Sequence, residues 1–248
     1  LLDDRSYAEE FCVARDFSPP FVARLMGAGF LVMSMPLDGD SGRGGAALLL
    51  PKLHLERSVL FFDALHTSRT VKRLIPRYEL KTTMEASGAV PGGALEMPVE
   101  GLQRVLERCA EVHGADWLTP PLRTVFEALY AEEGIGGKRC LAPGPQIAGC
   151  PQIAGCPQIV GFGLYRRGQL VAGEFGVAVG RVYTSYSGYY DEDSAGSVQL
   201  ALTGRYLRDS GFAFWDLGMP LPYKEKLGAR TVDRARFLEL FRTAAANK

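Results

Sequence analysis

One carboxylate in the chain stands where an enzyme could use it, at the end of a short apolar and aromatic segment. Residues 212–217 read Phe-Ala-Phe-Trp-Asp-Leu, which predicts a buried strand that ends near Asp216. A carboxylate in such a place can orient an amine or accept its proton. The same residue type also forms turns and caps helices, so a turn-forming role stays open for Asp216.

The residues before Asp216 predict the elements that position it. A hairpin is expected at Gly168, between two short runs of strand-forming residues. Alternating apolar and small residues predict a central strand over 177–183. A helix is expected over about 195–210 and ends at Gly211. The segment therefore predicts three strands, a helix and a fourth strand.

Composition and charge describe an ordinary globular protein. The 248 residues include 28 Lys and Arg against 28 Asp and Glu, so any binding to nucleic acid must come from a local patch. The sequence has no run of about 18 apolar residues and no signal peptide, so we expect a cytoplasmic protein that does not bind membranes. Its five cysteines form no CxxC pair, so we expect no metal site and a reducing compartment.

The most basic stretch of the chain lies between residues 69 and 81. Its five cations, against the single acid Glu79, are Arg69, Lys72, Arg73, Arg77 and Lys81. Thr67 or Ser68 is placed to cap a helix that carries the first three cations on one face. Such a face can bind phosphates, but it can also be an ordinary solvated helix surface, and both interpretations stay open.

The middle of the chain predicts a boundary and an insertion. Residues 83–97 are rich in Gly, Pro and Ala, as expected of a linker. Two amphipathic helices follow, with Trp117 between them. The hexapeptide at 145–150 repeats unchanged at 151–156, and its Pro and Gly residues exclude a helix or a central strand. We interpret residues from about 136 to 158 as a surface insertion.

Several short motifs resemble those of the leucyl/phenylalanyl-tRNA–protein transferase family. The matching segments are residues 173–177, 185–187, 211–212, 226–230 and 236–238, with Asp216, Pro51, Arg57 and the run Leu65-His66-Thr67-Ser68-Arg69. The resemblance implies an α+β fold of the acetyltransferase-like (GNAT) type. It also implies transfer of an amino acid from charged tRNA to the N-terminus of an acceptor protein, in the N-degron pathway of protein degradation.

The same resemblance implies the partners, and the linker over 83–97 predicts two domains. The partners would be aminoacyl-tRNA and a protein or peptide N-terminus, with no cofactor and no metal. Residues 1–85 would form a small N-terminal α/β domain, and residues 86–248 an acetyltransferase-like domain that carries the insertion.

Site residues follow from the resemblance as well. It implies a catalytic role for Asp216, and we expect Tyr186, if it points inward, to share that catalytic role by donating a hydrogen bond where the family has other polar groups. The implied substrate-binding residues are Trp117, Glu174, Tyr183, Ser187 and Gly188, and the implied tRNA-binding residues are Arg57, Arg69, Lys72 and Arg73.

The chain departs from the family pattern at four of its site positions. Tyr186 stands in place of an acid, Gly218 in place of an amide, Gly188 in place of Met and Glu174 in place of an apolar residue. An inward-facing Glu174 would favour a cationic or polar aminoacyl group, whereas strand alternation could equally turn it to solvent.

Two other classes of function stay open. A small-molecule acetyltransferase of the same fold would need a glycine-rich turn for the pyrophosphate of CoA, and the corresponding residues 191–196 are acidic. A diverged relative could instead bind tRNA or a protein N-terminus without transferring anything. Titrations with CoA and with charged tRNA distinguish the three classes.

Overall fold

The chain folds around one large mixed sheet. The computed structural model describes residues 9–37, 46–84, 95–114, 117–134 and 157–246, and in them an eight-stranded sheet has the order β10-β3-β9-β8-β7-β6-β4-β5. Its strands are β3 (Glu56–Leu60), β4 (Glu79–Thr82), β5 (Leu95–Glu96), β6 (Gln158–Arg166), β7 (Gln169–Val179), β8 (Val182–Tyr190), β9 (Phe214–Asp216) and β10 (Arg230–Asp233). A second, two-stranded sheet pairs β1 (Leu31–Pro36) with β2 (Ala47–Lys52).

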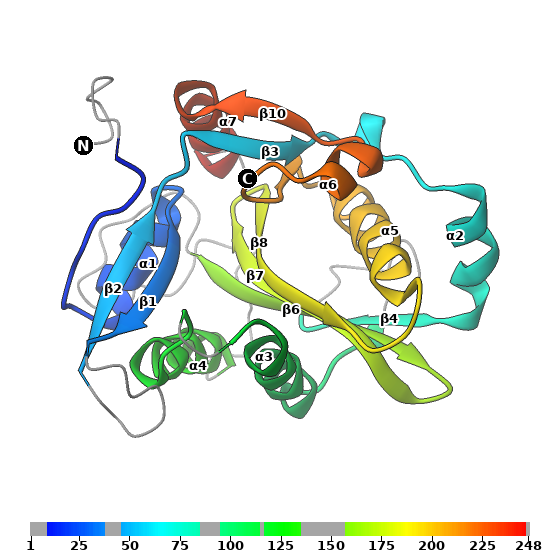
Figure 1. Cartoon of the computed structure of the whole chain (residues 1–248), viewed down its shortest axis with the longest axis horizontal. Helices are drawn as coiled ribbons and strands as arrows, with labels where there is room; N and C mark the ends of the chain where they lie inside the picture. Colours follow the sequence, from blue (N-terminus) through cyan, green and yellow to red (C-terminus); the bar gives the residue numbers. More distant parts are fainter. Residues whose placement is uncertain (1–8, 38–45, 85–94, 115–116, 135–156, 247–248) are drawn as a thin grey trace.

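Helices cover both faces of the large sheet. They are α1 (Pro19–Gly27), α2 (Arg69–Leu74), α3 (Val99–His113), α4 (Pro120–Gly134), α5 (Ala195–Asp209), α6 (Pro222–Leu227) and α7 (Arg234–Ala246). Figure 1 shows α5 on one side of β6, β7 and β8, and α3 and α4 on the other side. The predicted α+β fold class is confirmed, because helices pack on a mixed sheet.

The two tight turns of the sheet differ in how well the sequence predicted them. The hairpin at Gly168 is confirmed, with positive φ angles at Arg167 (52°) and Gly168 (78°) that suit a two-residue turn between antiparallel strands. The continuous strand predicted over 177–183 is wrong, because the chain reverses at Gly180 and β8 begins at Val182. Gly180 has a φ of 53°, and a side chain there would lie 2.5 Å from the backbone of Ala245.

One strand–helix–strand unit carries Asp216 into the sheet. β8 pairs in parallel with β9, and α5 makes the connection between them. The predicted helix and its end at Gly211, with a φ of 81°, are confirmed. The register sets Thr184 opposite Asp216.

Apolar side chains hold the helices against the two faces of the large sheet. Helix α3 turns Leu102, Val105, Leu106 and Cys109 toward the sheet, as its periodicity predicts, and all four are buried. They join the larger core cluster with Phe126 of α4. On the other face of the sheet, a second cluster forms around Phe162, Tyr183 and Trp215.

The sheet runs across the domain boundary expected at residue 85. β3 and β4 precede that residue, yet β3 lies between β10 and β9, and β4 pairs with β6. The insertion expected over 136–158 lies outside the described residues as far as residue 156. Within the described part, no helix is both long and apolar enough to span a membrane.

Candidate active site

A β-bulge divides the residues around the site between the two faces of the sheet. The β7–β8 register shifts so that Phe175 pairs with Ser187 and Gly176 pairs with Ser185, which leaves Tyr186 as the extra residue. Bulges of this kind redirect side chains locally. Tyr186 therefore packs toward α3 and α4, whereas Ser185 lies on the α5 face with Glu174.

Asp216 is fully buried and its carboxylate is held entirely by protein groups. Oδ2 forms an ion pair with Arg57 Nη1 at 3.2 Å and accepts a hydrogen bond from Thr184 Oγ1 at 3.1 Å. Oδ1 accepts from the backbone N–H of Gly218 at 2.9 Å. The turn-forming interpretation of Asp216 thus agrees with its contacts, and the residue also anchors a buried cation.

Arg57 lies inside the protein rather than on a tRNA-binding surface. Its side chain is 0% exposed, it donates from Nη2 to the carbonyl of Gly29 at 2.8 Å, and its guanidinium lies 4.5 Å from the ring centroid of Phe237. The expectation that Arg57 contacts tRNA phosphates is therefore corrected. Its contact with Asp216 has the distance of an ion pair but not the alignment of a hydrogen bond, and within the described residues Nε has no partner.

Tyr186 and Trp117 belong to one aromatic group. Trp117 stacks on Phe175 with centroids 6.1 Å apart, and Phe126 meets Tyr186 edge-on at 5.8 Å. The Tyr186 hydroxyl accepts from the N–H of Val32 at 3.1 Å, and burial raises the pKa of this phenol well above its usual value.

The Tyr186 hydroxyl also reaches a second backbone group, the carbonyl of Phe30 at 3.4 Å. The phenol thus accepts from a backbone group at the start of β1 and donates to one just before it. This fixes the position of Tyr186 on the α4 side of the sheet.

Glu174 points inward, toward α5. Its side chain is 5% exposed, and Oε2 accepts a hydrogen bond from Ser185 Oγ at 3.1 Å. Burial raises the pKa of this carboxyl to about 7, while Ser185 and Thr203 act to lower it. Tyr183 lies buried on the same face, so the structure brings these two expected substrate-binding residues together.

The remaining two expected substrate-binding residues lie toward α3. The Ser187 hydroxyl interacts with the thiol of Cys109, whose pKa burial raises to about 12. The carbonyl of Gly188 lies 2.7 Å from Nε2 of His113, at the end of α3. A Cβ at position 188 would come within 3.1 Å of the Cβ of Glu174, so the two strands approach closely there.

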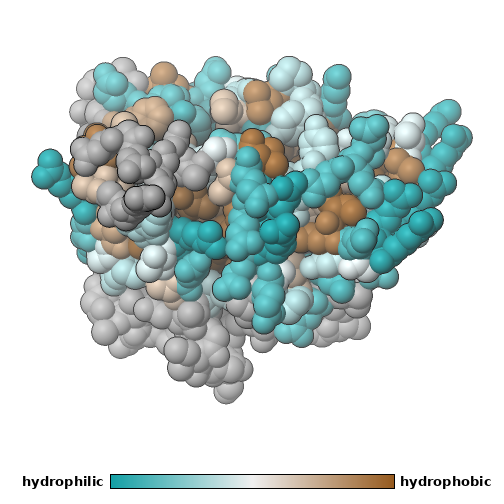
Figure 2. All heavy atoms as spheres, turned by 60° about the horizontal axis from the view of Figure 1, so that its bottom comes forward, coloured by the Kyte–Doolittle hydropathy of each residue, from teal (hydrophilic) through white to brown (hydrophobic). Residues whose placement is uncertain are grey.

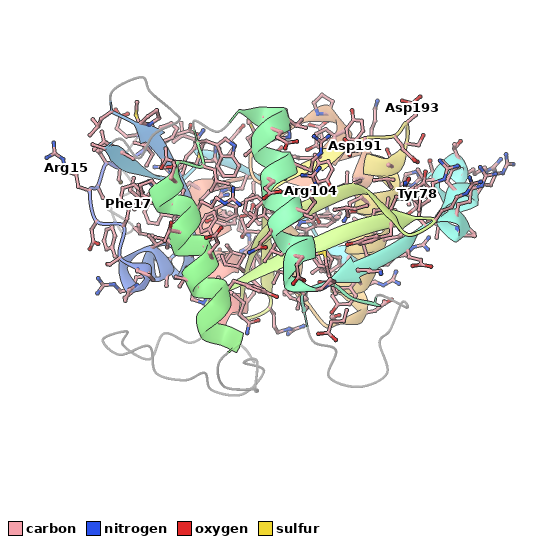
Figure 3. The ribbon with its side chains drawn as sticks, turned by 90° about the horizontal axis from the view of Figure 1, so that it is seen from below. Arg15, Phe17, Tyr78, Arg104, Asp191 and Asp193 are labelled. Atoms are coloured by element: carbon pink, nitrogen blue, oxygen red, sulfur yellow. The ribbon has the colours of Figure 1, made fainter. Side chains whose placement is uncertain are left out.

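The predicted basic face of α2 is exposed. Ser68 caps the helix by accepting from the N–H of Val71 at 3.2 Å, which confirms the sequence prediction. Its exposed cations, together with that of the following 3-10 turn, are Arg69, Lys72, Arg73 and Arg77. In Figure 3, nitrogen-tipped side chains project outward at this end of the molecule, next to the labelled Tyr78. Figure 2 shows hydrophilic side chains gathered at the same end.

Lys224 is a buried residue close to Asp216 that the sequence analysis did not single out. It is buried, and its ammonium donates to the carbonyls of Leu217 at 2.5 Å and Met219 at 2.8 Å. Burial lowers the pKa of this amine to about 8, against the opposing effect of Asp216. The surrounding Pro-Tyr-Lys-Glu-Lys run reads as an exposed basic turn, so only the tertiary structure identifies Lys224.

The described residues contain no group of three or more His, Cys, Asp or Glu side chains that could hold a metal ion. The arrangement instead consists of a buried ion pair, an aromatic group and a buried polar cluster.

Comparison with known proteins finds a similar family. A family model described as leucyl/phenylalanyl-tRNA protein transferase matches residues 158–242. A protein of that name from Pseudomonas aeruginosa (strain LESB58) is 25% identical over 186 residues, and one from Stutzerimonas stutzeri (strain A1501) is 26% identical over the same length. Each alignment covers 74% of this chain and 66% of the relative.

Among solved structures, a conserved protein of unknown function from Bacteroides thetaiotaomicron covers 96% of this chain and is itself covered to 60%. It has 11% identity to this chain and a TM-score of 0.36. By sequence this chain is similar to the leucyl/phenylalanyl-tRNA–protein transferases, and the matching family model covers residues 158–242.

Proposed function

We propose that the chain transfers an amino acid from charged tRNA to the N-terminus of an acceptor protein. The observation that carries this proposal is the family match over residues 158–242, which runs from the start of β6 into the last helix, α7. The family name states the reaction of the relatives, and the proposal extends that reaction to this chain.

The chemistry asked of the site is aminolysis of an ester. The α-amine of the acceptor attacks the aminoacyl carbonyl, and the 3′-oxygen of the tRNA's terminal adenosine leaves. Because the ester is already activated, orientation of the two substrates and stabilisation of the oxyanion supply most of what the reaction needs.

Asp216 and Tyr186 take indirect parts in this proposal. We infer that Asp216 acts through the groups it holds, because Arg57, Thr184 and the N–H of Gly218 occupy its carboxylate. Tyr186 is likewise bound to backbone groups. Both therefore act in this proposal as positioning residues for the strand ends around them.

Substrate binding would use the surface features on either side of the sheet. We propose that the α2 cations bind tRNA phosphates and that Trp117, half-buried beside Phe175, stacks against the terminal adenosine. Base stacking on an aromatic side chain contributes roughly 1–3 kcal/mol.

We also propose that the fold is of the acetyltransferase-like type. Its support is the parallel β8–α5–β9 unit set in an otherwise mainly antiparallel sheet. A cytoplasmic location and a part in N-terminal marking of proteins for degradation belong to the same proposal.

The test is a transfer assay with purified chain, radiolabelled aminoacyl-tRNA and peptides that differ in their first residue. Label should move to the peptide α-amine, and a peptide with an acetylated N-terminus is the control. If no aminoacyl-tRNA gives transfer while tRNA still binds, the second candidate function replaces the first. That candidate is a relative that binds tRNA or protein N-termini, and the burial of Asp216 and the tyrosine at position 186 favour it.

A further inference from the structure

Lys224 of α6 is buried beside the ion pair of Arg57 and Asp216. Its side chain is 7% exposed, and proteins almost never bury a lysine that lacks a partner of opposite charge. Helix α6 lies next to β3, the strand that carries Arg57 (Figure 1). The burial of a second cation at this place therefore needs a physical reason.

Two backbone carbonyls hold the Lys224 nitrogen and leave one of its positions unused. Nζ donates to the carbonyls of Leu217 at 2.5 Å and Met219 at 2.8 Å, and it has no further hydrogen-bond partner among the described residues. An ammonium has three N–H groups, whereas the neutral amine has two N–H groups and a lone pair. Both forms can keep the two hydrogen bonds, so only the third position changes when Lys224 loses its proton.

The charges around Nζ favour the loss of that proton. Asp216 already forms an ion pair with Arg57 at 3.2 Å, so it is not free to neutralise Lys224. The imidazole of His54 is neutral, because burial lowers its pKa to about 3. Burial lowers the pKa of Lys224 to about 8, Asp216 opposes this shift and Arg57 adds to it. An amine of this kind can both accept and donate a proton near neutral pH.

The surface next to Lys224 leaves room for a reacting group. The ring centroid of Tyr223 lies 5.6 Å from Nζ, and the side chains of Tyr223 and Met219 are 51% and 52% exposed. Burial raises the pKa of the Tyr223 phenol, so this group is neutral. At Gly218, an added Cβ would meet one described atom outside its chain neighbours, Cδ1 of Leu31 at 4.0 Å. The turn that Lys224 holds therefore has free space beside the amine.

We propose that Lys224 carries the proton in the transfer reaction. The inference rests on the proposed function and adds a catalytic residue to it. The acceptor α-amine attacks the aminoacyl carbonyl carbon, a C–N bond forms, and the neutral Lys224 amine takes the proton that the attacking nitrogen loses. The C–O bond to the 3′-oxygen then breaks, and the Lys224 ammonium gives its proton to that oxygen. Lys224 is thus neutral again after each transfer.

An NMR titration tests the amine without requiring transfer. The chain is labelled with ¹³C at lysine Cε, and the signal that disappears in Lys224→Met identifies Lys224. Its titration midpoint should lie near pH 8. A midpoint at the ordinary lysine value of about 10.4 overturns the proposal, because the amine would then stay protonated at neutral pH.

Transfer rates of Lys224→Arg test the proton step itself. The guanidinium keeps a positive charge and N–H donors for the two carbonyls, but it does not lose its proton. Above about pH 8 the wild type should transfer about 100-fold faster than this variant. The ratio of the two rates should fall at lower pH, because only the wild type then loses a lone pair. The titration of the acceptor amine affects both proteins and cancels from the ratio.

The matched control is Lys226→Met, which removes an exposed lysine from the same helix and should transfer at the wild-type rate. If Lys224→Arg does not fold, Lys224→Met provides the same comparison with wild type. A role limited to holding the turn predicts a rate ratio that does not change with pH, and that result overturns the proposal.

The outcomes separate this proposal from the proposed function. Transfer by Lys224→Arg at the wild-type rate rejects the role of Lys224 and leaves the proposed function standing. Transfer by the wild type together with an ordinary lysine titration does the same. Absence of transfer by the wild type rejects the proposed function, and the proton step with it.

Discussion

Replacement of Asp216 by Asn tests whether the buried ion pair holds the site together. The substitution keeps the size of the side chain and its place beside Thr184, but it leaves the Arg57 guanidinium without a counter-ion at 0% exposure. Removing one partner of a buried ion pair costs about 3–5 kcal/mol, because the remaining charge stays desolvated.

The matched control is an ion pair of the same chemistry on the surface. Arg208 and Asp209 lie 2.8 Å apart with side chains 50% and 27% exposed. Asp209→Asn should cost no more than about 1 kcal/mol, since water replaces the lost partner. In a chain of this length 1 kcal/mol corresponds to roughly 2–4 °C in Tm, so Asp216→Asn should lower Tm by roughly 6–20 °C.

Urea unfolding followed by tryptophan fluorescence measures both costs, and Trp215 next to Asp216 provides a local signal. The double variant Arg57→Met with Asp216→Asn should be more stable than Asp216→Asn alone, because no buried charge remains. The ion-pair reasoning is refuted if Asp216→Asn lowers the free energy of unfolding no more than Asp209→Asn does. It is also refuted if the double variant is the least stable of all. A stable Asp216→Asn that has lost transfer would instead return Asp216 to direct catalysis.

Three further changes probe other parts of the chain. In the double variant Arg69→Ala with Lys72→Ala, the plot of log binding constant for tRNA against log salt concentration should be less steep, by roughly 0.7–0.9 per lost phosphate contact. Filter binding measures this slope, and an unchanged slope would exclude α2 from the tRNA interface. Glu174→Gln should remove a pH dependence of stability. Burial raises the carboxyl pKa from 4.5 to about 7, so the folded wild type binds more protons than the unfolded chain between these pH values. Its free energy of unfolding should therefore fall by up to about 3 kcal/mol as the pH rises from about 4.5 to about 7. Parallel curves of unfolding free energy against pH for the two proteins would contradict this. Tyr186→Phe should lower Tm by roughly 2–4 °C through loss of the hydrogen bond from Val32, seen by calorimetry against wild type, and a larger loss of transfer than of stability would indicate a direct part in the reaction.

Much of the local structure could be predicted because it depends on neighbours in the chain. The hairpin at Gly168, the helix that ends at Gly211 and the cap at Ser68 follow from residues that favour or forbid particular backbone angles. The buried face of α3 follows from its periodicity. The missed reversal at Gly180 shows the limit of this reasoning, because small residues suit both a central strand and a tight turn.

The site could be predicted only in part, because its meaning depends on contacts between distant segments. The sequence by itself determined that Asp216 ends a buried strand, that a cationic helix starts at Arg69, and that residues 158–242 carry the family pattern. Strand alternation alone could not decide which way Glu174 faces.

Only the tertiary structure decided which groups meet. It buried Arg57 against Asp216, directed Glu174 toward α5 beside a bulge, and placed Lys224 inside the protein. The physical reason is that periodicity reports which face of an element is buried, but not what lies opposite that face. The charge state and role of a buried polar group depend on the partner that packing brings to it.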